Sequence, residues 1–151
     1  MDRSMQVGGC ELLHELAFEA RASALGEMRR QVTEILAQAG CAKGEIQSIV
    51  IALNEACMNI IQHAYGGDSS KPIRMHIEVN DKGVHFELLD CAAPIDLARV
   101  RGRSLQDLRP GGLGVNFIAQ LMHDVQYSHR TENAGNCLRM AWKGRPRASD
   151  A

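Results

Sequence analysis

The sequence predicts a two-layer α/β sandwich, in which a mixed, mostly antiparallel sheet carries its helices on one face. Two segments with apolar residues at helical spacing are followed by a hairpin of alternating apolar and polar residues, and two further strand patterns close the chain. This order is typical of helices packed on one face of a sheet. At 151 residues the chain fits one domain, which we expect over residues 10–144, with flexible termini at 1–9 and 145–151.

The first half of the chain contains the two helix patterns. Residues 11–18 alternate only loosely, which is compatible with a first strand. Apolar residues then recur three and four apart from about 21 to 39, and Gly40 stands where a left-handed helix cap is expected. The second helix is predicted over about 43–64, because a long apolar stripe continues almost to a pair of glycines.

The clearest strand pair is a hairpin in the middle of the chain. Apolar residues alternate with polar ones over 73–79, residues 80–83 supply turn chemistry, and the alternation resumes over 84–88. The last third of the chain predicts one short amphipathic helix followed by two closing strands, over 115–122, 125–130 and 136–143.

Between residues 90 and 114 neither helical nor strand periodicity is present. This segment holds two prolines and four arginines: Arg99, Arg101, Arg103 and Arg109. A loop of this length without regular structure is unusual in a compact domain unless it is a lid or a binding loop. Its arginines either neutralise the charge of a ligand or form a solvated basic loop, and the sequence leaves both readings open.

Composition and cysteine usage exclude several classes of function. Charged residues make up 23% of the chain, and a formal net charge of −1 provides no field for attracting nucleic acid or an anionic membrane. No apolar run is long enough to span a membrane. The five cysteines are odd in number and widely spaced, which is not the pattern of a disulfide framework or a zinc site. We therefore expect a cytoplasmic protein that contacts neither nucleic acid nor membrane directly.

The second predicted helix carries a polar row away from its apolar stripe. Glu55, Asn59 and His63 stand four residues apart, so their side chains follow one another along one side of an α-helix. The small residues Ala52 and Ala56 border this row and leave room for a ligand. The row fits either a solvated helix face or a ligand site, and these residues alone do not decide between the two.

Two further features follow the predicted hairpin. Asp90 ends the return strand, and the glycines of residues 111–114 lead directly into the last predicted helix. Closely spaced glycines before a helix N-terminus allow backbone N–H groups to surround a phosphate. Each feature alone is common in turns and caps, and the Walker pattern is absent. The order of the three features along the chain is much more specific than any one of them.

In this order the three features resemble the histidine-kinase-like ATPase domain shared by gyrase, histidine kinases and MutL, which has the Bergerat-type ATP-binding fold. Within that superfamily the sequence looks most like the bacterial anti-sigma factor serine/threonine kinases, the family of SpoIIAB and RsbW. Residues 53–59 with 63–65 stand at the family's N box, 89–96 at its first glycine box and 111–122 at its second. The resemblance covers about residues 11–143.

The resemblance implies ATP and Mg²⁺ as ligands, and a role for each matched residue. Asn59 would hold Mg²⁺ through its side-chain oxygen, and Glu55 would orient or deprotonate the attacking hydroxyl or a water. Asp90 would accept a hydrogen bond from the adenine amino group. His63 would lie near the phosphates or pack at the helix end. The backbone amides of the second glycine box would hold the phosphates: Gly111, Gly112, Leu113 and Gly114.

Two positions depart from the family pattern, both on the adenine side. Ala92 stands two residues after Asp90, where the family usually has glycine, and its methyl group is expected to narrow the pocket or restrict the turn. Cys137, preceded by Asn136, stands where the final strand often carries a threonine that helps to bind adenine. A thiol is a poorer hydrogen-bond partner than a hydroxyl. We expect weakened ATP binding rather than lost chemistry.

By resemblance, the chain is an ATP-dependent serine/threonine kinase that acts as an anti-sigma factor. It would bind a sigma factor and phosphorylate a STAS-type anti-anti-sigma protein, whose interface the added charge would break. Family members commonly dimerise, which allows a homodimer. One alternative is a module that regulates a partner by binding alone, with or without ATP; Ala92 and Cys137 favour it, whereas Glu55 and Asn59 oppose it. The other is a protein whose polar row is merely solvated, which the order of the three boxes opposes.

Overall fold

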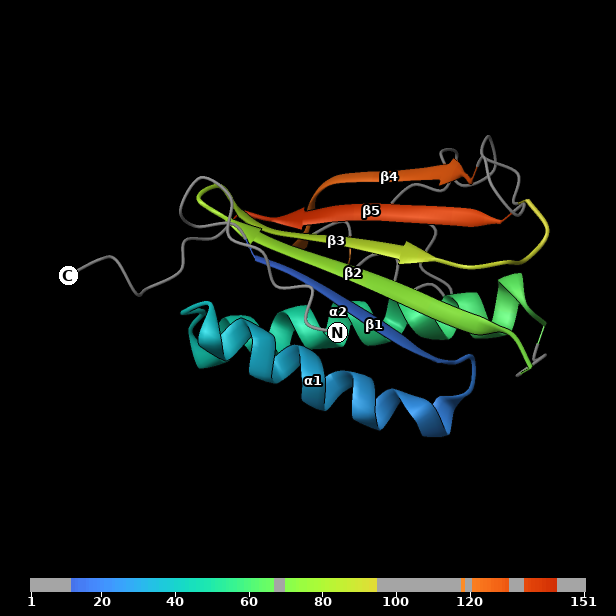
Figure 1. Ribbon diagram of the computed structural model, residues 1–151, viewed down its shortest axis with the longest axis horizontal. Helices are drawn as coiled ribbons and strands as arrows, with labels where there is room; N and C mark the ends of the chain where they lie inside the picture. The colour runs from blue at the N-terminus through green and yellow to red at the C-terminus, as the bar shows by residue number, and fades with distance from the viewer. Residues whose placement is uncertain (1–11, 67–69, 95–117, 119–120, 131–134, 144–151) are drawn as a thin grey trace.

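The computed structural model describes residues 12–66, 70–94, 118, 121–130 and 135–143, which form one sheet with helices along one of its faces (Figure 1). This two-layer α/β sandwich confirms the predicted fold class. The helices are α1 (Leu25–Gln38) and α2 (Lys43–Asn59), with the short turns η1 (Ala22–Ala24) before α1 and η2 (Ile60–Ala64) after α2. The described strands are β1 (Leu12–Glu19), β2 (Pro72–Asn80), β3 (Gly83–Leu89), β4 (His123–His129) and β5 (Asn136–Trp142).

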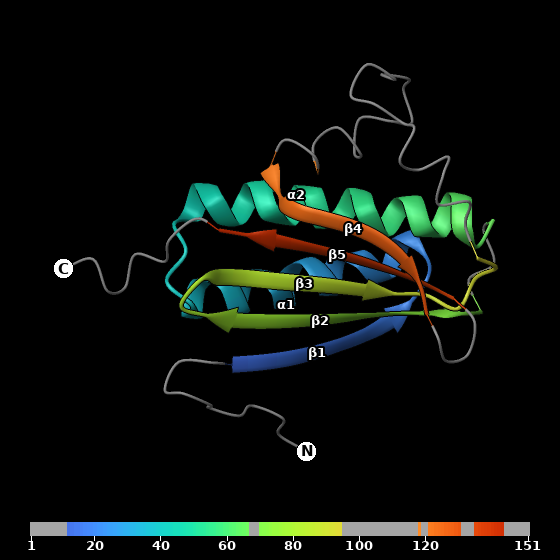
Figure 2. The ribbon, with the colours of Figure 1, turned by 90° about the horizontal axis from the view of Figure 1, so that it is seen from above.

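The strands lie in the order β1-β2-β3-β5-β4, as Figure 2 shows from above the sheet. The sequence predicts a mixed sheet, whereas every neighbouring pair of the described strands is antiparallel. Because β5 is inserted between β3 and β4, the end of β3 lies beside the start of β5, where Leu89 pairs with Cys137. The topology therefore brings the residues that follow β3 next to those that begin β5.

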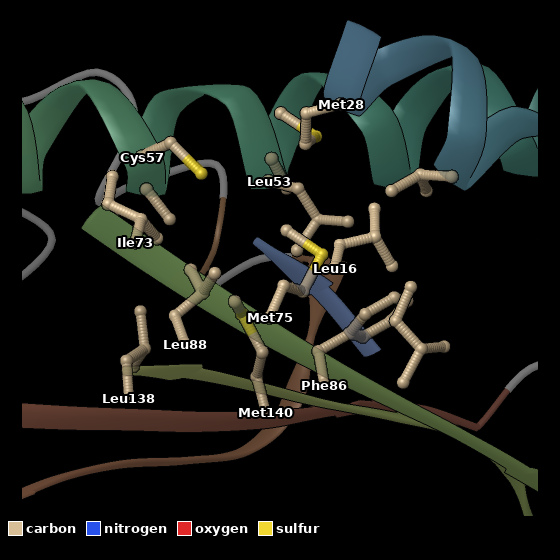
Figure 3. Close-up of a cluster of buried hydrophobic side chains, with 14 of the residues drawn as sticks. Leu16, Met28, Leu53, Cys57, Ile73, Met75, Phe86, Leu88, Leu138 and Met140 are labelled. Atoms are coloured by element: carbon tan, nitrogen blue, oxygen red, sulfur yellow. The ribbon is translucent and has the colours of Figure 1, made fainter. Parts of the chain in front are cut away.

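The core lies between the sheet and the helices. Strand alternation turns one set of β2 and β3 side chains toward the helices, and each of them is at most 2% exposed: Ile73, Met75, Ile77, Val84, Phe86 and Leu88. They meet Met28 of α1 and Leu53 and Cys57 of α2 (Figure 3). Burying each large apolar side chain contributes about 1.5–3 kcal/mol, so this layer is the main source of stability.

The structure confirms the predicted strands, each within two residues of its expected ends. The first predicted helix begins with the η1 turn and becomes α-helical at Leu25. Of the last predicted helix, residues 118 and 121 are helical, and the Met122 N–H donates to Ile118 O at 2.8 Å. Met122 is described and is not helical, whereas residues 115–117 and 119–120 of this helix, and the arginines predicted for the lid, lie outside the described residues. Neither α1 nor α2, nor any other described helix, is long and apolar enough to cross a membrane.

The last turn of the second predicted helix differs from the expectation. Residues 60–64 form a π-turn, in which the Tyr65 N–H donates to Ile60 O at 2.9 Å. In an α-helix His63 would lie about 40° around from Asn59, and the wider π-turn changes this angle. His63 is exposed there, whereas Glu55 and Asn59 are partly exposed.

The sheet face turned away from the helices, here called the open face, carries a row of charged side chains. Glu15, His76, Glu87 and Arg139 occupy paired positions on four adjacent strands. His76 lies 3.4 Å from Glu15 and 3.0 Å from Glu87, and Arg139 Nε donates to Glu87 Oε2 at 2.8 Å. These residues line a hollow of about 750 Å³.

Strand β4 is irregular where it begins. The pairing with β5 shifts register between His123 and Gln126, which is the signature of a β-bulge. Among the described non-glycine residues only Asp124, inside this irregularity, has a positive φ, of 54°. Its carboxylate accepts from Lys143 Nζ at 2.8 Å, just beyond the end of β5.

Gly83, at the start of β3, tolerates no side chain. Its φ is 131°, and a Cβ built there would lie 2.2 Å from Trp142 O. We expect Gly83→Ala to lower the free energy of unfolding by about 2–4 kcal/mol, because β5 must move. The matched control is Gly44→Ala in α2, where a Cβ meets nothing within 4 Å; it should raise stability by about 0.5–1 kcal/mol. Urea unfolding compares them, and equal stabilities would contradict the argument.

Glu87 makes the free energy of unfolding depend on pH in the acidic range. Partial burial raises the pKa of its carboxyl, but hydrogen bonds from Arg139 and His76 outweigh this effect and hold the pKa below its ordinary value of 4.5. A depressed pKa contributes stability above the unfolded-state pKa that is lost as the pH falls through the folded-state pKa. We expect Glu87→Gln to cost about 0.5–1 kcal/mol at pH 7 and progressively less below pH 4.5. Urea midpoints measured from pH 3 to 7 test this, and a pH-independent difference would contradict it.

Candidate functional site

The first component of the site is the buried carboxylate of Asp90, which directly follows β3. Asp90 is 4% exposed. Its Oδ1 accepts hydrogen bonds from the backbone N–H of Ala92 at 2.9 Å, and from Asn136 N at 3.2 Å and Nδ2 at 3.0 Å. Within the described part of the chain these bonds all end on Oδ1, so Oδ2 is the oxygen available to a ligand.

Asn136 is a site residue that the sequence reasoning passed over in favour of Cys137. Besides its two bonds to Asp90, its Nδ2 donates to Ala93 O at 3.0 Å, and its own backbone oxygen accepts from Asp90 N at 3.0 Å. Strand alternation in the sequence could have identified Asn136. The side chains of Leu138 and Met140 are buried against the helices, and Asn136 lies on the same side of β5. Asn136 thus fixes both the rotamer of Asp90 and the turn that follows it.

The structure does not bring Cys137 to the side chain of Asp90. Cys137 points to the open face, where its Sγ donates to Glu87 Oε2 at 3.6 Å. Burial and the nearby Glu87 charge raise the pKa of this thiol, so it is protonated at neutral pH. A thiol in place of a hydroxyl at this position therefore weakens hydrogen bonding on the open face, and not on the side of the sheet that carries Asp90.

Ala92 fits the Asp90 turn without strain. It is 3% exposed and donates its backbone N–H to Asp90 Oδ1 at 2.9 Å. Among the described non-glycine residues only Asp124 has a positive φ, so the backbone at Ala92 does not require glycine. The expected restriction of the turn by the methyl group is thus absent from the backbone geometry.

The backbone around Asp90 is held closely against the start of β5. Gly135 has a φ of 153°, and a Cβ built there would lie 2.1 Å from Asp90 O, so this close approach requires glycine. The guanidinium of Arg130, at the end of β4, donates to Asp90 O at 3.0 Å, and its backbone N–H donates to Gly135 O at 2.9 Å. Arg130 therefore fastens β4, β5 and the Asp90 turn together.

The second component is the polar side of α2. Glu55 and Asn59 are partly exposed, whereas the intervening Ala56 and Cys57 are at most 2% exposed. Ala52, predicted to leave room beside the row, is itself fully buried. The carboxyl-terminal end of α2, which carries Asn59, lies at the same end of the molecule as the end of β3 (Figures 1 and 2).

Of the remaining predicted site residues, His63 belongs to the described structure and is exposed in the π-turn. Its place near the phosphates stays a prediction. The second glycine box lies outside the described residues: Gly111, Gly112, Leu113 and Gly114. Its role in holding phosphate stays a prediction.

Tyr65 connects the two components, although no role was expected for it from the sequence. Its ring is 8% exposed, and its hydroxyl donates to Pro72 O at 2.7 Å and accepts from Cys91 N at 2.7 Å. Burial raises the pKa of Tyr65 to about 12, so the hydroxyl keeps its proton at neutral pH. One side chain thus spans from the end of the α2 helix to the residue after Asp90.

Together these residues can recognise a ligand with a donor at one end and negative charge at the other. The fixed Oδ2 of Asp90 accepts from an N–H group, and the Asn59 amide oxygen suits a hard cation that accompanies phosphates. Glu55, one helical turn before Asn59, can accept a proton there. An adenine nucleotide with Mg²⁺ fits this set of groups.

Comparison with known proteins gives a family match over most of the chain. A family model described as the histidine kinase-like ATPase domain matches residues 18–142. The serine-protein kinase RsbW of Halalkalibacterium halodurans is 33% identical over 136 residues, covering 83% of this chain and 80% of that protein. RsbW of Bacillus cereus is 31% identical over 126 residues, covering 76% of each.

A solved structure of the RsbU and RsbW domains of a Mycobacterium tuberculosis protein has a TM-score of 0.59 at 20% identity. The likeness covers 87% of this chain and 32% of that longer chain, and it shows a shared fold. The family match, by contrast, spans both components of the site, since residues 18–142 include α2, the Asp90 turn and β5. The chain belongs to the histidine kinase-like ATPase domain family, among the relatives of the RsbW serine-protein kinases.

Proposed function

We propose that this chain is an ATP-dependent serine/threonine protein kinase that acts as an anti-sigma factor. The observation that carries the proposal is the Asp90 turn, in which a buried carboxylate is held by hydrogen bonds to Oδ1. This turn lies at the same end of the molecule as the end of the helix that bears Glu55 and Asn59. The kinase activity is supported by relatives named serine-protein kinases that match most of the chain.

The adenine side of the proposed site selects its base by hydrogen bonding. An ionised carboxylate only accepts hydrogen bonds, so Asp90 Oδ2 favours the amino group of adenine over the carbonyl that guanine presents at the same position. Asn136 occupies Oδ1 with its own N–H groups and so keeps Oδ2 directed away from itself. Selectivity in this proposal therefore depends on Asn136 as well as on Asp90.

The phosphate side of the proposed site uses α2. Asn59 would hold Mg²⁺ through its amide oxygen, and the bound ion would supply positive charge to the phosphates. Glu55 would orient the attacking serine or threonine hydroxyl of the substrate and accept its proton. Backbone amides of residues 111–114 would complete the phosphate contacts.

The proposed partners are a sigma factor, which the chain would bind and silence, and a STAS-type anti-anti-sigma protein, which it would phosphorylate. A phosphoserine adds about −1.5 to −2 charges, enough to disrupt a tight interface and release the antagonist. We further propose that the chain acts in the cytoplasm and forms a homodimer, as the resemblance to its family implies.

Nucleotide binding is the first test. We expect calorimetry to give Mg²⁺-assisted ATP binding, with Asp90→Asn raising the Kd about 10- to 100-fold, because a hydrogen bond to a charged group contributes about 1.5–3 kcal/mol. Asn59→Ala should remove the benefit of Mg²⁺. The matched control is Asp81→Asn in the exposed β2–β3 turn, at the other end of β3, which should bind like the wild type. A wild type that binds no ATP at millimolar concentration would favour a module that acts by binding a partner alone.

Glu55 separates binding from turnover. Since general-base catalysis contributes about 10²–10⁴-fold, we expect Glu55→Gln to keep the wild-type ATP affinity within about threefold and to slow phosphate transfer at least 100-fold. The assay follows labelled phosphate from ATP onto the serine of a STAS-domain protein, with Glu34→Gln on the exposed side of α1 as control. Unchanged transfer by Glu55→Gln would exclude it as the base.

A further inference from the structure

The π-turn at the end of α2 determines where Tyr65 lies. At about 100° per residue, a continuous α-helix would turn Tyr65 roughly 140° away from Ile60, which faces the core. In the π-turn Tyr65 N bonds to Ile60 O, five residues back, so Tyr65 comes round nearly beneath Ile60. Both residues are accordingly buried, at 8% and 9% exposed. The wide turn thus swings the tyrosine ring inward.

The hydroxyl of the buried Tyr65 ring bonds to two backbone groups in different parts of the chain. The hydroxyl donates to the carbonyl oxygen of Pro72, the first residue of β2, and accepts from the N–H of Cys91, both at 2.7 Å. Both distances are those of well-formed O–H···O and N–H···O bonds. The hydroxyl therefore ties the end of the α2 helix to the sheet and to the Asp90 turn.

The groups on either side of this tie are the two halves of the proposed nucleotide site. Asn59 is the residue immediately before the π-turn, and Asp90 is the residue immediately before Cys91. The Tyr65 hydroxyl is thus hydrogen-bonded to the residue that follows Asp90, and Tyr65 itself follows the turn that begins after Asn59.

We propose that the Tyr65 hydroxyl is a positioning group that sets the spacing between the adenine-binding turn at Asp90 and the phosphate-binding end of α2. This inference rests on the proposed function, since the two halves matter together only for a ligand that reaches both. Adenine and triphosphate belong to one molecule, so a change in spacing weakens the contacts at one end whenever the other is engaged. A ligand that occupies one half alone is insensitive to the spacing.

The test compares ATP with adenosine in Tyr65→Phe, which keeps the buried ring and removes only the hydroxyl. Competition against a fluorescent ATP analogue gives both affinities with Mg²⁺ present. We expect the Kd for ATP to rise about 10-fold and that for adenosine to change less than about twofold, a 10-fold loss being 1.4 kcal/mol. Amide hydrogen exchange should in addition become faster at Cys91, which loses its acceptor. Tyr127→Phe, at the other tyrosine of the chain, is the matched control and should leave both affinities unchanged.

The outcomes separate this inference from the proposed function. Equal losses for ATP and adenosine would mean that the hydroxyl only supports the local fold, and unchanged ATP affinity would mean that it does not set the spacing; either result overturns the inference alone. A wild type that binds no ATP overturns the proposed function and the inference with it. Cys91 exchange, which needs no nucleotide, then still reports whether the hydroxyl holds the Asp90 turn.

Discussion

A carboxylate that is 4% exposed must find hydrogen-bond donors inside the protein, because an unpaired buried charge costs several kcal/mol. For Asp90 these donors come from its own turn and from Asn136, the first residue of β5. Asn136 can reach Asp90 because β5 is inserted between β3 and β4, and because Gly135 permits an approach that any Cβ would block. The pairing of one side chain thus constrains the strand order, the turn before β5 and the residue types that begin it.

Helix α2 serves the core and the site at once, and its sequence separates these two demands by face. Leu53 and Cys57 are fully buried against the sheet, whereas Glu55 and Asn59 remain partly exposed. A rigid helix packed in this way holds its polar side chains more firmly than a loop does, which favours metal and proton chemistry that depends on placement. The Asp90 turn obtains comparable rigidity from hydrogen bonds instead, through Asn136, Arg130 and Tyr65.

The sequence predicted the two long helices and the described strands because each rests on a local pattern, and it predicted the family because three such patterns follow one another in a specific order. Alternation along β2 identified the hairpin, since one face of that strand is buried and the other is not. The sequence pointed to Cys137 rather than Asn136, although these two residues lie on opposite faces of β5. Choosing between them requires knowing which face of β5 packs against the helices, and the burial of Leu138 and Met140 identifies that face. The π-turn left no local pattern at all. It is associated with a hydrogen bond from Cys91, 26 positions beyond Tyr65, which lies outside the windows in which local patterns are read.

The bulge at the start of β4 has a consequence for self-recognition between sheets. A regular outer strand presents a ladder of N–H and C=O groups on which another chain can build, the usual route to strand-swapped aggregates and fibrils. At Asp124 the backbone turns to a positive φ, and the carboxylate is paired with Lys143, so the ladder is interrupted and charged where it begins. Growth of the sheet past β4 is therefore disfavoured where this strand begins.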